Sequence, residues 1–293
     1  MSRESLKIPS KTFLLGEYAV LTGGPALVLA HPPFFSLKKT NKPKLFHPKS
    51  PASLLMKKHG LRQDFDFLDP HRGGGGFGGS TAEVISSLKN RHDINIAELL
   101  ADYKNLFTES GAEPSGADLC TQWLFTSEDL SGARLAVFKM KTEVSGEFCK
   151  GIEWPFKDIS MMIFKRPKKA QTHTHLNSLN SSDIDFVKLR RISEEGLSFL
   201  ERSDFRFFDS LNDFTKEQKK LSLLDENSFK EISKIRELPS VITARACGAL
   251  GMDVVTVFCS LKEDLDKIKA KIVDFDFNYD LITTLGRGDF KSE

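Results

Sequence analysis

The residues best suited to chemistry form a glycine run at positions 73–79. Six of these seven residues are glycine, and Phe77 alone interrupts them. Glycine has no Cβ, so its backbone N–H groups can approach an anion closely. The sequence STAE at 80–83 follows and fits a capping box, which predicts a helix with Ser80 as its N-cap. A helix N-terminus attracts negative charge, so the pattern favours a phosphate cradle over the alternative of a flexible surface loop.

Two familiar phosphate-binding motifs do not fit this run. Gly74, Gly76 and Gly79 satisfy GxGxxG, but any glycine run does, and a dinucleotide fold places that motif in its first strand–helix–strand unit. A Walker A loop needs a lysine before its serine or threonine, and no lysine precedes Ser80. The run therefore predicts a phosphate cradle of another kind.

Other reactive side chains are ambiguous when each is taken alone. Asp118 ends the segment PSGAD, and a loop aspartate is usually a helix cap. Lys11 by itself has the character of a surface lysine. His173 and His175 in THTH lack an evident third ligand, which favours a loop over a metal site.

The order of the strands and helices expected around these residues predicts an α+β fold with two lobes. Strands are expected at residues 6–8, 12–15, 64–67, 133–163 and 254–259, and as two buried strands in 19–30 joined at Gly23-Gly24-Pro25. Helices are expected after Ser80 and over 96–107, 183–202, 206–222, 228–237 and 261–272. Strands dominate first and helices later, which indicates an N-terminal lobe at 1–158 and a C-terminal lobe at 159–293.

Composition excludes several classes of protein. The chain has 293 residues, 40% of them hydrophobic and 28% charged, which argues against a disordered or collagen-like chain. No apolar run approaches the roughly 18 residues of a membrane span, and the start MSRESLKIPS is no signal peptide. The four cysteines are far apart without a CxxC pair, so neither a zinc site nor a disulfide framework is indicated. We expect a cytoplasmic protein with no membrane partner.

Charge is balanced overall but unevenly distributed. The 42 basic and 40 acidic residues give no reason to expect a nucleic-acid partner. Residues 36–60, however, contain seven lysines and no acid, and a second basic cluster lies at 165–169. Such segments are usually solvated surface; the alternative is a positive field that attracts a polyanionic small molecule.

Four separated segments, in chain order, resemble motifs of the GHMP kinases, the superfamily of galactokinase and of homoserine, mevalonate and phosphomevalonate kinases. They are PSKTFLLGEYAVLTGGPALVLA (9–30), PHRGGGGFGGSTA (70–82), PSGAD (114–118) and RACGALGMD (245–253). The second is similar to the nucleotide motif Pro-x3-Gly-Leu-Gly-Ser-Ser-Ala, and the last to Lys-x-Ser-Gly-Ala-Gly-x-Gly-Asp. The resemblance implies a two-lobed GHMP kinase-like fold that holds ATP in the cleft between the lobes and phosphorylates a small-molecule acceptor.

The resemblance also implies roles for individual residues. Asp118 matches the catalytic aspartate, which accepts or orients the acceptor's proton, and Lys11 matches a lysine that stabilises developing charge. Ser80 matches a magnesium ligand, so Mg²⁺ is the expected metal. The nucleotide-binding positions are Gly75, Gly76, Gly78, Gly79, Ser80 and Thr81. The positions that shape the substrate pocket are Glu17, Tyr18, Ser115, Gly116, Gly248 and Ala249.

The acceptor is expected to be phosphomevalonate. The sequence GEYAVL at 16–21 is more similar to phosphomevalonate kinases than to mevalonate kinases, in which a histidine usually follows the glutamate. Asp253 in the last motif favours the same acceptor. Mevalonate kinase is the nearest alternative. A GHMP-like protein that binds nucleotide or metabolite without turnover is another, and a diphosphomevalonate decarboxylase is a third. The sequence makes no prediction of oligomeric state.

Several residues differ from the family's motifs, and these differences are the reason for considering a protein that binds nucleotide or metabolite without turnover. Gly79 stands at the first serine of the nucleotide motif, and Arg245 replaces the lysine of the last motif. Leu250 and Met252 stand where glycines are expected. Phe107 occupies the position of a metal-binding glutamate of mevalonate kinases, although Glu109 is near in sequence. These changes leave open the second metal ligand and the identity of the acceptor.

Overall fold

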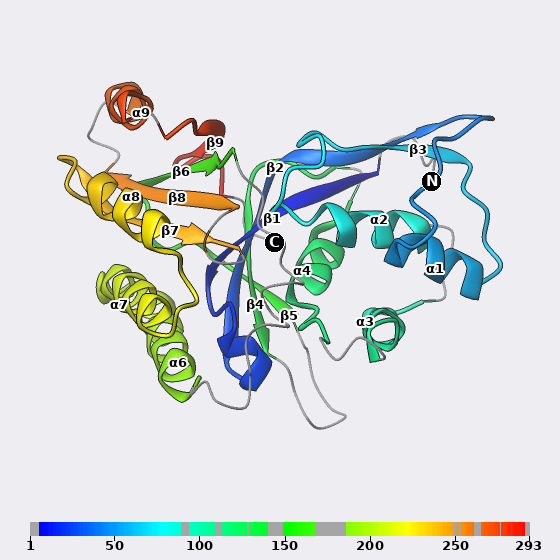
Figure 1. Ribbon diagram of the computed structural model, residues 1–293, viewed down its shortest axis with the longest axis horizontal. Coiled ribbons are helices and arrows are strands. Elements are labelled where there is room, and N and C mark those ends of the chain that lie inside the picture. Colours follow the sequence, from blue (N-terminus) through cyan, green and yellow to red (C-terminus); the bar gives the residue numbers. More distant parts are fainter. Residues whose placement is uncertain are drawn as a thin grey trace.

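Two antiparallel sheets, each with its helices, lie side by side in the computed structural model (Figure 1). The structure describes residues 6–88, 94–108, 113–127, 129–139, 149–167, 186–248, 251, 253–260, 265–275 and 277–290. Within these ranges the fold is the mixed α+β architecture that the order of elements predicted. The N-terminal part of the chain builds one sheet and the C-terminal part the other.

The long strand β2 organises the first sheet. Its strands are β1 (Lys7–Leu15), β2 (Pro25–Lys39), β3 (Phe65–Leu68), β4 (Arg134–Lys139) and β5 (Cys149–Ile152). The order is β1-β2-β4-β5, and β3 pairs with the last residues of β2. The start of β2 pairs with β1 on one side and β4 on the other, and its apolar side chains are buried on both faces of the sheet, Leu27 and Leu29 in one hydrophobic cluster and Val28 in another.

The prediction of two strands in residues 19–30 is half wrong. Residues Ala19–Thr22 form a short 3-10 helix, η2, and only the residues from Pro25 onward form a strand. The N–H groups of Gly23 and Gly24 bond back to the carbonyls of Val20 and Ala19. These local bonds satisfy the backbone before β2 begins, so residues 19–22 pair with no strand.

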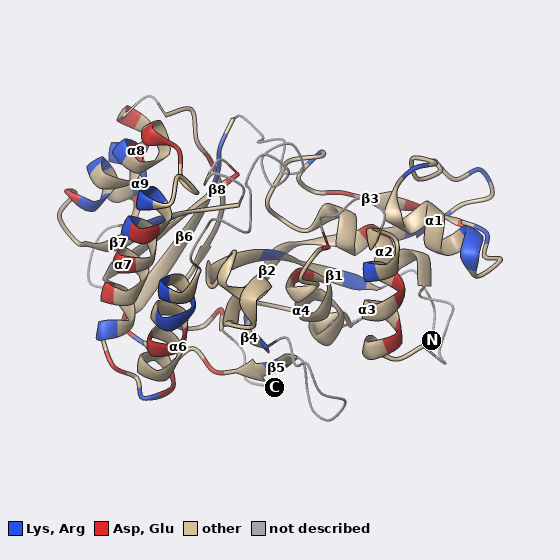
Figure 2. Cartoon of the chain, turned by 60° about the horizontal axis from the view of Figure 1, so that its bottom comes forward, with Lys and Arg blue, Asp and Glu red and all other residues tan. Residues whose placement is uncertain are grey.

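Four helices complete the N-terminal lobe. They are α1 (Pro51–Lys58), α2 (Gly79–Leu88), α3 (Ile96–Asn105) and α4 (Ala117–Phe125). Buried side chains of α1, α2 and α4 share one core with Ile8, Val28 and Phe35 of the sheet. The lysine-rich residues 36–60 include the end of β2 and the whole of α1. Helix α1 lies at the end of the molecule remote from the second sheet (Figure 2). There Lys58 pairs with Asp102 of α3 at 2.6 Å.

The second sheet has helices on both faces. It comprises β6 (Ile159–Lys165), β7 (Val241–Cys247), β8 (Val254–Ser260) and β9 (Asp280–Leu285) in the order β7-β8-β6-β9. Its helices are α6 (Val187–Glu201), α7 (Arg206–Lys220), α8 (Glu226–Arg236) and α9 (Leu265–Asp274). Along β8, Val254 and Phe258 pack with α6 and α7, whereas Val255 and Val257 pack with α8 and α9. This alternation follows from the two-residue period of a strand.

The two halves of the chain share one hydrophobic core. Leu15, Leu27 and Leu29 of the first sheet belong to the same buried cluster as Met161 and Phe258 of the second. The predicted boundary between residues 158 and 159 falls at the start of β6. The division into domains at this point stays a prediction.

A buried ion pair also joins the halves. Arg245 of β7 is fully buried and donates to the Glu17 carboxylate and to the Leu14 carbonyl of β1. Its guanidinium also lies 4.7 Å from the ring centre of Phe214. Since a buried cation is costly without a partner, Arg245 and Glu17 depend on each other.

No helix in the described part of the chain is long and apolar enough to cross a membrane.

Replacing Arg245 with methionine should lower the free energy of unfolding by about 3–5 kcal/mol, because Glu17 would be left as an unpaired buried charge. The double variant Arg245→Met/Glu17→Gln should recover part of this loss. Denaturant unfolding measures both. The exposed i,i+4 pair Arg191–Glu195 supplies the control, Arg191→Met, which should cost under about 1 kcal/mol. An equal cost for both arginines would show that the buried pair does not hold the lobes together.

Candidate active site

The glycine run enters α2 directly. The helix begins at Gly79, so the prediction of Ser80 as N-cap is wrong, and Gly78 stands before the helix with φ +82°. The Gly78 carbonyl accepts hydrogen bonds from the Ala82 N–H at 2.9 Å and from the Thr81 hydroxyl at 3.0 Å. Because side chains disfavour this left-handed conformation, glycine fits it better than serine. Ser80 therefore lies in the first helical turn, with its side chain exposed.

The loop before α2 is packed rather than loose. Phe77 is fully buried, and its ring stacks on His71 with centroids 4.0 Å apart. The Asp69 carboxylate accepts from the N–H groups of His71 at 2.8 Å and Gly73 at 2.6 Å. Such aspartate-to-backbone bonds fix turns. The structure thus agrees with a built cradle and not with a flexible surface loop.

Two buried histidines, His31 and His71, lie beside the glycine loop. Burial lowers the pKa of His71 to about 4 and that of His31 to about 3, so both are neutral at pH 7. The Ser10 hydroxyl donates to the Pro33 carbonyl and lies 2.6 Å from His71 Nε2. His71 Nε2 is therefore the donor in this pair, which leaves its Nδ1 without a proton.

Strand β1 brings Lys11 to the cradle. The Lys11 N–H donates to the Phe77 carbonyl at 3.1 Å, and the Lys11 side chain passes beside Gly78. Its Nζ lies 3.8 Å from the Asp118 carboxylate. A Cβ at Gly78 would lie 2.8 Å from Lys11 Cγ. The two residues expected to be catalytic therefore meet at the entrance of α2.

The segment PSGAD fixes where Asp118 points. Gly116 is the N-cap of α4 with φ +78°, and a Cβ there would collide with Leu100. The Ser115 hydroxyl accepts from the Ala117 N–H at 3.3 Å. Asp118 consequently lies in the first turn of α4, where the helix dipole favours a negative charge.

Gln122 is a site residue that sequence reasoning missed. It lies one turn after Asp118 on α4 and is fully buried. Its Nε2 donates to the Pro9 carbonyl at 2.7 Å, and its Oε1 accepts from the Thr81 hydroxyl. Gln122 thus joins α4, β1 and α2 around Gly78. Its spacing of four residues from Asp118 was the available signal, because i and i+4 share a helix face.

The second and last motifs meet at Asp253. A Cβ at Gly76 would lie 2.7 Å from Asp253 Cβ, and one at Gly248 would collide with its carboxylate. Asp253 is buried, and it lines a cavity of about 210 Å³ together with residues 72–75 and 165–167. Gly75 is therefore a cavity residue, as the nucleotide prediction requires. Ala249, Leu250 and Met252 lie outside the described residues.

Glu17 and Tyr18 lie apart from this cavity, in the core shared by the lobes. Tyr18 is buried with φ +63° and belongs to the same hydrophobic cluster as Phe258. One oxygen of the Glu17 carboxylate is occupied by Arg245. Their roles in acceptor binding stay predictions.

Comparison with solved structures shows the same fold in several kinases. Mevalonate kinase of Methanococcus jannaschii is 14% identical, with a TM-score of 0.63 over 96% of this chain and 98% of that one. Phosphomevalonate kinase of Streptococcus pneumoniae with phosphomevalonate and AMPPNP is 14% identical, with a TM-score of 0.68 over 95% and 98%. Galactokinase of Lactococcus lactis with galactose is 11% identical, with a TM-score of 0.69 over 94% and 92%. The chain has the GHMP-kinase fold. No family model matches the sequence, and no curated protein does.

Phe107, which the sequence comparison placed at the metal-binding position of mevalonate kinases, has an aromatic neighbour. Phe107 packs on Tyr103 with ring centres 5.3 Å apart. Glu109 lies outside the described residues, as do His173 and His175. Among the residues that are described, no group of three His, Cys, Asp or Glu side chains is arranged to hold a metal.

Replacing Gly78 with valine should abolish binding of a non-hydrolysable ATP analogue. A Cβ there would lie 2.8 Å from both Gln122 Nε2 and Lys11 Cγ, and the backbone conformation is strained for valine. Gly60→Val is the matched control, because Gly60 has φ +64° but no atom within 4 Å of its Cβ position. Calorimetry compares the two. Unchanged affinity in Gly78→Val would remove the glycine loop from the nucleotide site.

The stability of the loop should depend on pH through His71. Between about pH 6.5 and about pH 4 the unfolded chain binds a proton at this residue that the folded chain does not. The free energy of unfolding should therefore fall as the pH falls through this window. His71→Gln should reduce the slope, whereas His47→Gln, at an exposed histidine, should keep it. Denaturant unfolding at several pH values tests this, and equal slopes in all three proteins would contradict it.

Proposed function

We propose that this chain is an ATP-dependent small-molecule kinase whose acceptor belongs to the mevalonate pathway, with phosphomevalonate preferred. The observation that carries the proposal is the Lys11–Asp118 pair, 3.8 Å apart, beside Gly78, the residue that precedes α2. Phosphoryl transfer needs a group that orients or deprotonates the acceptor and cations that stabilise the transferred group. The shared fold with small-molecule kinases supports the same conclusion.

Asp118 would accept the proton of the acceptor hydroxyl. Asp118 lies in the first turn of α4, and its carboxylate is the type of group that can accept this proton. Lys11 would stabilise negative charge on the group in transfer. The side chains of Lys11 and Asp118 are 12% and 26% exposed, so both are largely shielded from water, which strengthens electrostatic interactions.

The glycine loop would hold the phosphates of ATP. The proposed contacts are Gly75, Gly76, Gly78, Gly79, Ser80 and Thr81. The loop suits a phosphate because Gly73, Gly76 and Gly78 hold positive-φ conformations that glycine allows, and the loop leads directly into the N-terminus of α2, where the helix dipole favours an anion. Ser80 would hold Mg²⁺ with its exposed hydroxyl, a hard oxygen ligand of the kind this ion prefers. When bound, the ion supplies positive charge to the phosphate oxygens.

Phosphomevalonate is the acceptor that the first motif favours. The sequence GEY at 16–18 and Asp253 support it, and the Streptococcus pneumoniae enzyme of this fold was solved with phosphomevalonate. The proposed acceptor contacts are Glu17, Tyr18, Ser115, Gly116, Gly248 and Ala249. Mevalonate kinase is the alternative, since the L. major enzyme, solved with R-mevalonate, also shares the fold at a TM-score of 0.63.

A binding protein without turnover is a second candidate. Two features favour it: the motif spacing puts Phe107, whose ring packs on Tyr103, where a metal-binding glutamate is expected, and the buried Arg245 pairs with the carboxylate of Glu17. Both remove a charged oxygen that a relative would use. Consumption of ATP distinguishes this candidate from a kinase.

The cytoplasm is the proposed location. All four cysteines are free, and three of them are buried. Free thiols are typical of a reducing compartment.

The decisive experiment offers ATP, Mg²⁺ and one acceptor at a time to the purified protein. The acceptors are mevalonate, phosphomevalonate, diphosphomevalonate, homoserine and galactose, and ADP release, carbon dioxide release and the phosphorylated product are measured. We expect phosphomevalonate to give the highest kcat/KM. Asp118→Asn should lower kcat by ~10²–10⁴-fold while the affinity for an ATP analogue is kept. Lys11→Met should also act mainly on kcat.

Each alternative has its own result. A higher kcat/KM for mevalonate would make the protein a mevalonate kinase, and carbon dioxide release would make it a decarboxylase. Binding of nucleotide without consumption for every acceptor would favour the binding protein. Near wild-type kcat in Asp118→Asn would show that Asp118 is not the base.

A further inference from the structure

Lys165 extends from the second sheet onto the glycine loop. It is the last residue of β6 and is half-buried. Its Nζ donates to the His71 carbonyl at 3.2 Å and lies 2.8 Å from the position that a Cβ on Gly74 would occupy. A cation from the C-terminal lobe therefore rests on the loop that the N-terminal lobe builds.

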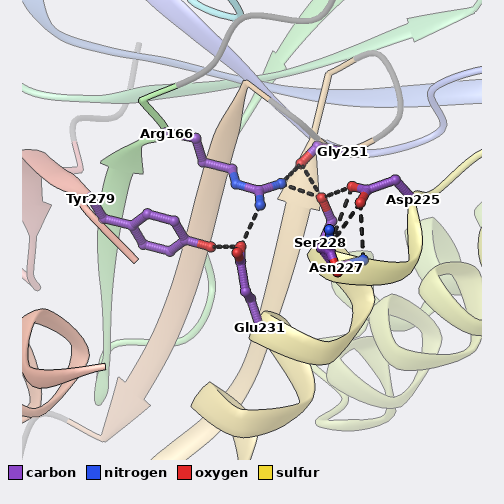
Figure 3. Close-up of polar contacts among 7 residues, drawn as sticks. All are labelled: Arg166, Asp225, Asn227, Ser228, Glu231, Gly251 and Tyr279. Carbon is purple, nitrogen blue, oxygen red and sulfur yellow. Dashed lines mark hydrogen bonds and ion pairs between the residues drawn. The ribbon is translucent and has the colours of Figure 1, made fainter. Parts of the chain in front are cut away.

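The neighbouring cation, Arg166, is already committed to the fold. Its guanidinium donates to the Gly251 carbonyl at 2.7 Å, to the Ser228 hydroxyl and to the Glu231 carboxylate, as Figure 3 shows. The side chain is 9% exposed. Glu231 also accepts from the Tyr279 hydroxyl. Arg166 thus ties the last motif, through Gly251, to α8 and is not available to a ligand.

Lys165 differs from Arg166 in its charge partners. Within the described ranges no carboxylate lies within 4.0 Å of its Nζ, and the His71 carbonyl is its hydrogen-bond partner. An ammonium group has three N–H donors, so two remain for a ligand. A half-buried cation with spare donors favours an anion nearby.

The cavity beside Lys165 is built for part of a ligand. Its volume is about 210 Å³, and it is lined by residues 72–75, residues 165–167 and Asp253. Pockets for whole small molecules measure roughly 300–1,000 Å³. The ammonium also offsets the negative charge that Asp253 brings to the same cavity.

We propose that Lys165 binds the phosphates of the nucleotide that are not transferred; this inference rests on the proposed function. Its position along the loop decides which phosphates these are. Lys11 and Asp118, where transfer would occur, lie at Gly78, whereas Lys165 contacts His71 and Gly74 at the other end. Lys165 is thus a residue that binds the nucleotide, and its loss should affect ADP and ATP alike.

Calorimetry with AMPPNP, ADP and adenosine tests the proposal on the full chain. Lys165→Met should weaken AMPPNP and ADP by roughly 10- to 100-fold, as expected for a hydrogen bond to a charged group, and leave adenosine unchanged. Lys165→Arg should retain most of the affinity. Lys230→Met is the matched control, because Lys230 is 71% exposed on α8, and it should bind like wild type.

A purely structural role for Lys165 predicts different results. Bracing of the loop alone would weaken adenosine as well and would leave the salt dependence of ADP binding unchanged. A direct phosphate contact instead makes ADP affinity less sensitive to salt in Lys165→Met than in wild type.

The remaining outcomes separate this inference from the proposed function. Unchanged ADP and AMPPNP affinity in Lys165→Met would overturn the role of Lys165 while the kinase proposal stands. Weakening of AMPPNP alone would overturn its assignment to the phosphates that stay with the nucleotide. Absence of nucleotide binding by the wild-type protein would overturn the proposed function, and this inference with it.

Discussion

The backbone hydrogen bond from Lys11 to Phe77 is the contact on which the site depends. It joins the central part of β1 to the glycine loop, and it places the Lys11 side chain between Gly78 and Asp118. Phe77 can hold this position because it is fully buried against His71. The loop is therefore fixed before any ligand binds, which reduces the entropy that binding would otherwise cost.

The contact between the lobes also depends on one pair of residues. Arg245 and Glu17 form an ion pair inside a core that both halves of the chain supply, so neither half buries its charge alone. Such a pair contributes little net stability relative to apolar residues, but removal of one partner is costly. It fixes β7 against β1 and thereby sets the distance between the last motif and the glycine loop.

Two lysines reach the glycine loop from different strands. Lys11 comes from β1 and lies at the end of the loop near Asp118, whereas Lys165 comes from β6 and lies at the other end. Arg166 stands next to Lys165 in sequence yet serves the fold through Glu231 and Gly251. Two adjacent basic residues thus have different uses, because successive side chains of an extended chain point in opposite directions.

The sequence by itself determined the fold class, the helices after residue 183 and the pairing of a glycine loop with a helix, because periodicity and glycine content are local properties. It also brought Lys11 and Asp118 forward through the resemblance of their motifs. Only the structure showed that η2 replaces a strand, that Gly78 rather than Ser80 precedes α2, and that Gln122 and Lys165 lie beside the glycine loop. The places of Gln122 and Lys165 depend on contacts with Pro9 and His71, which are far from them in the chain, and the local sequence does not encode such contacts.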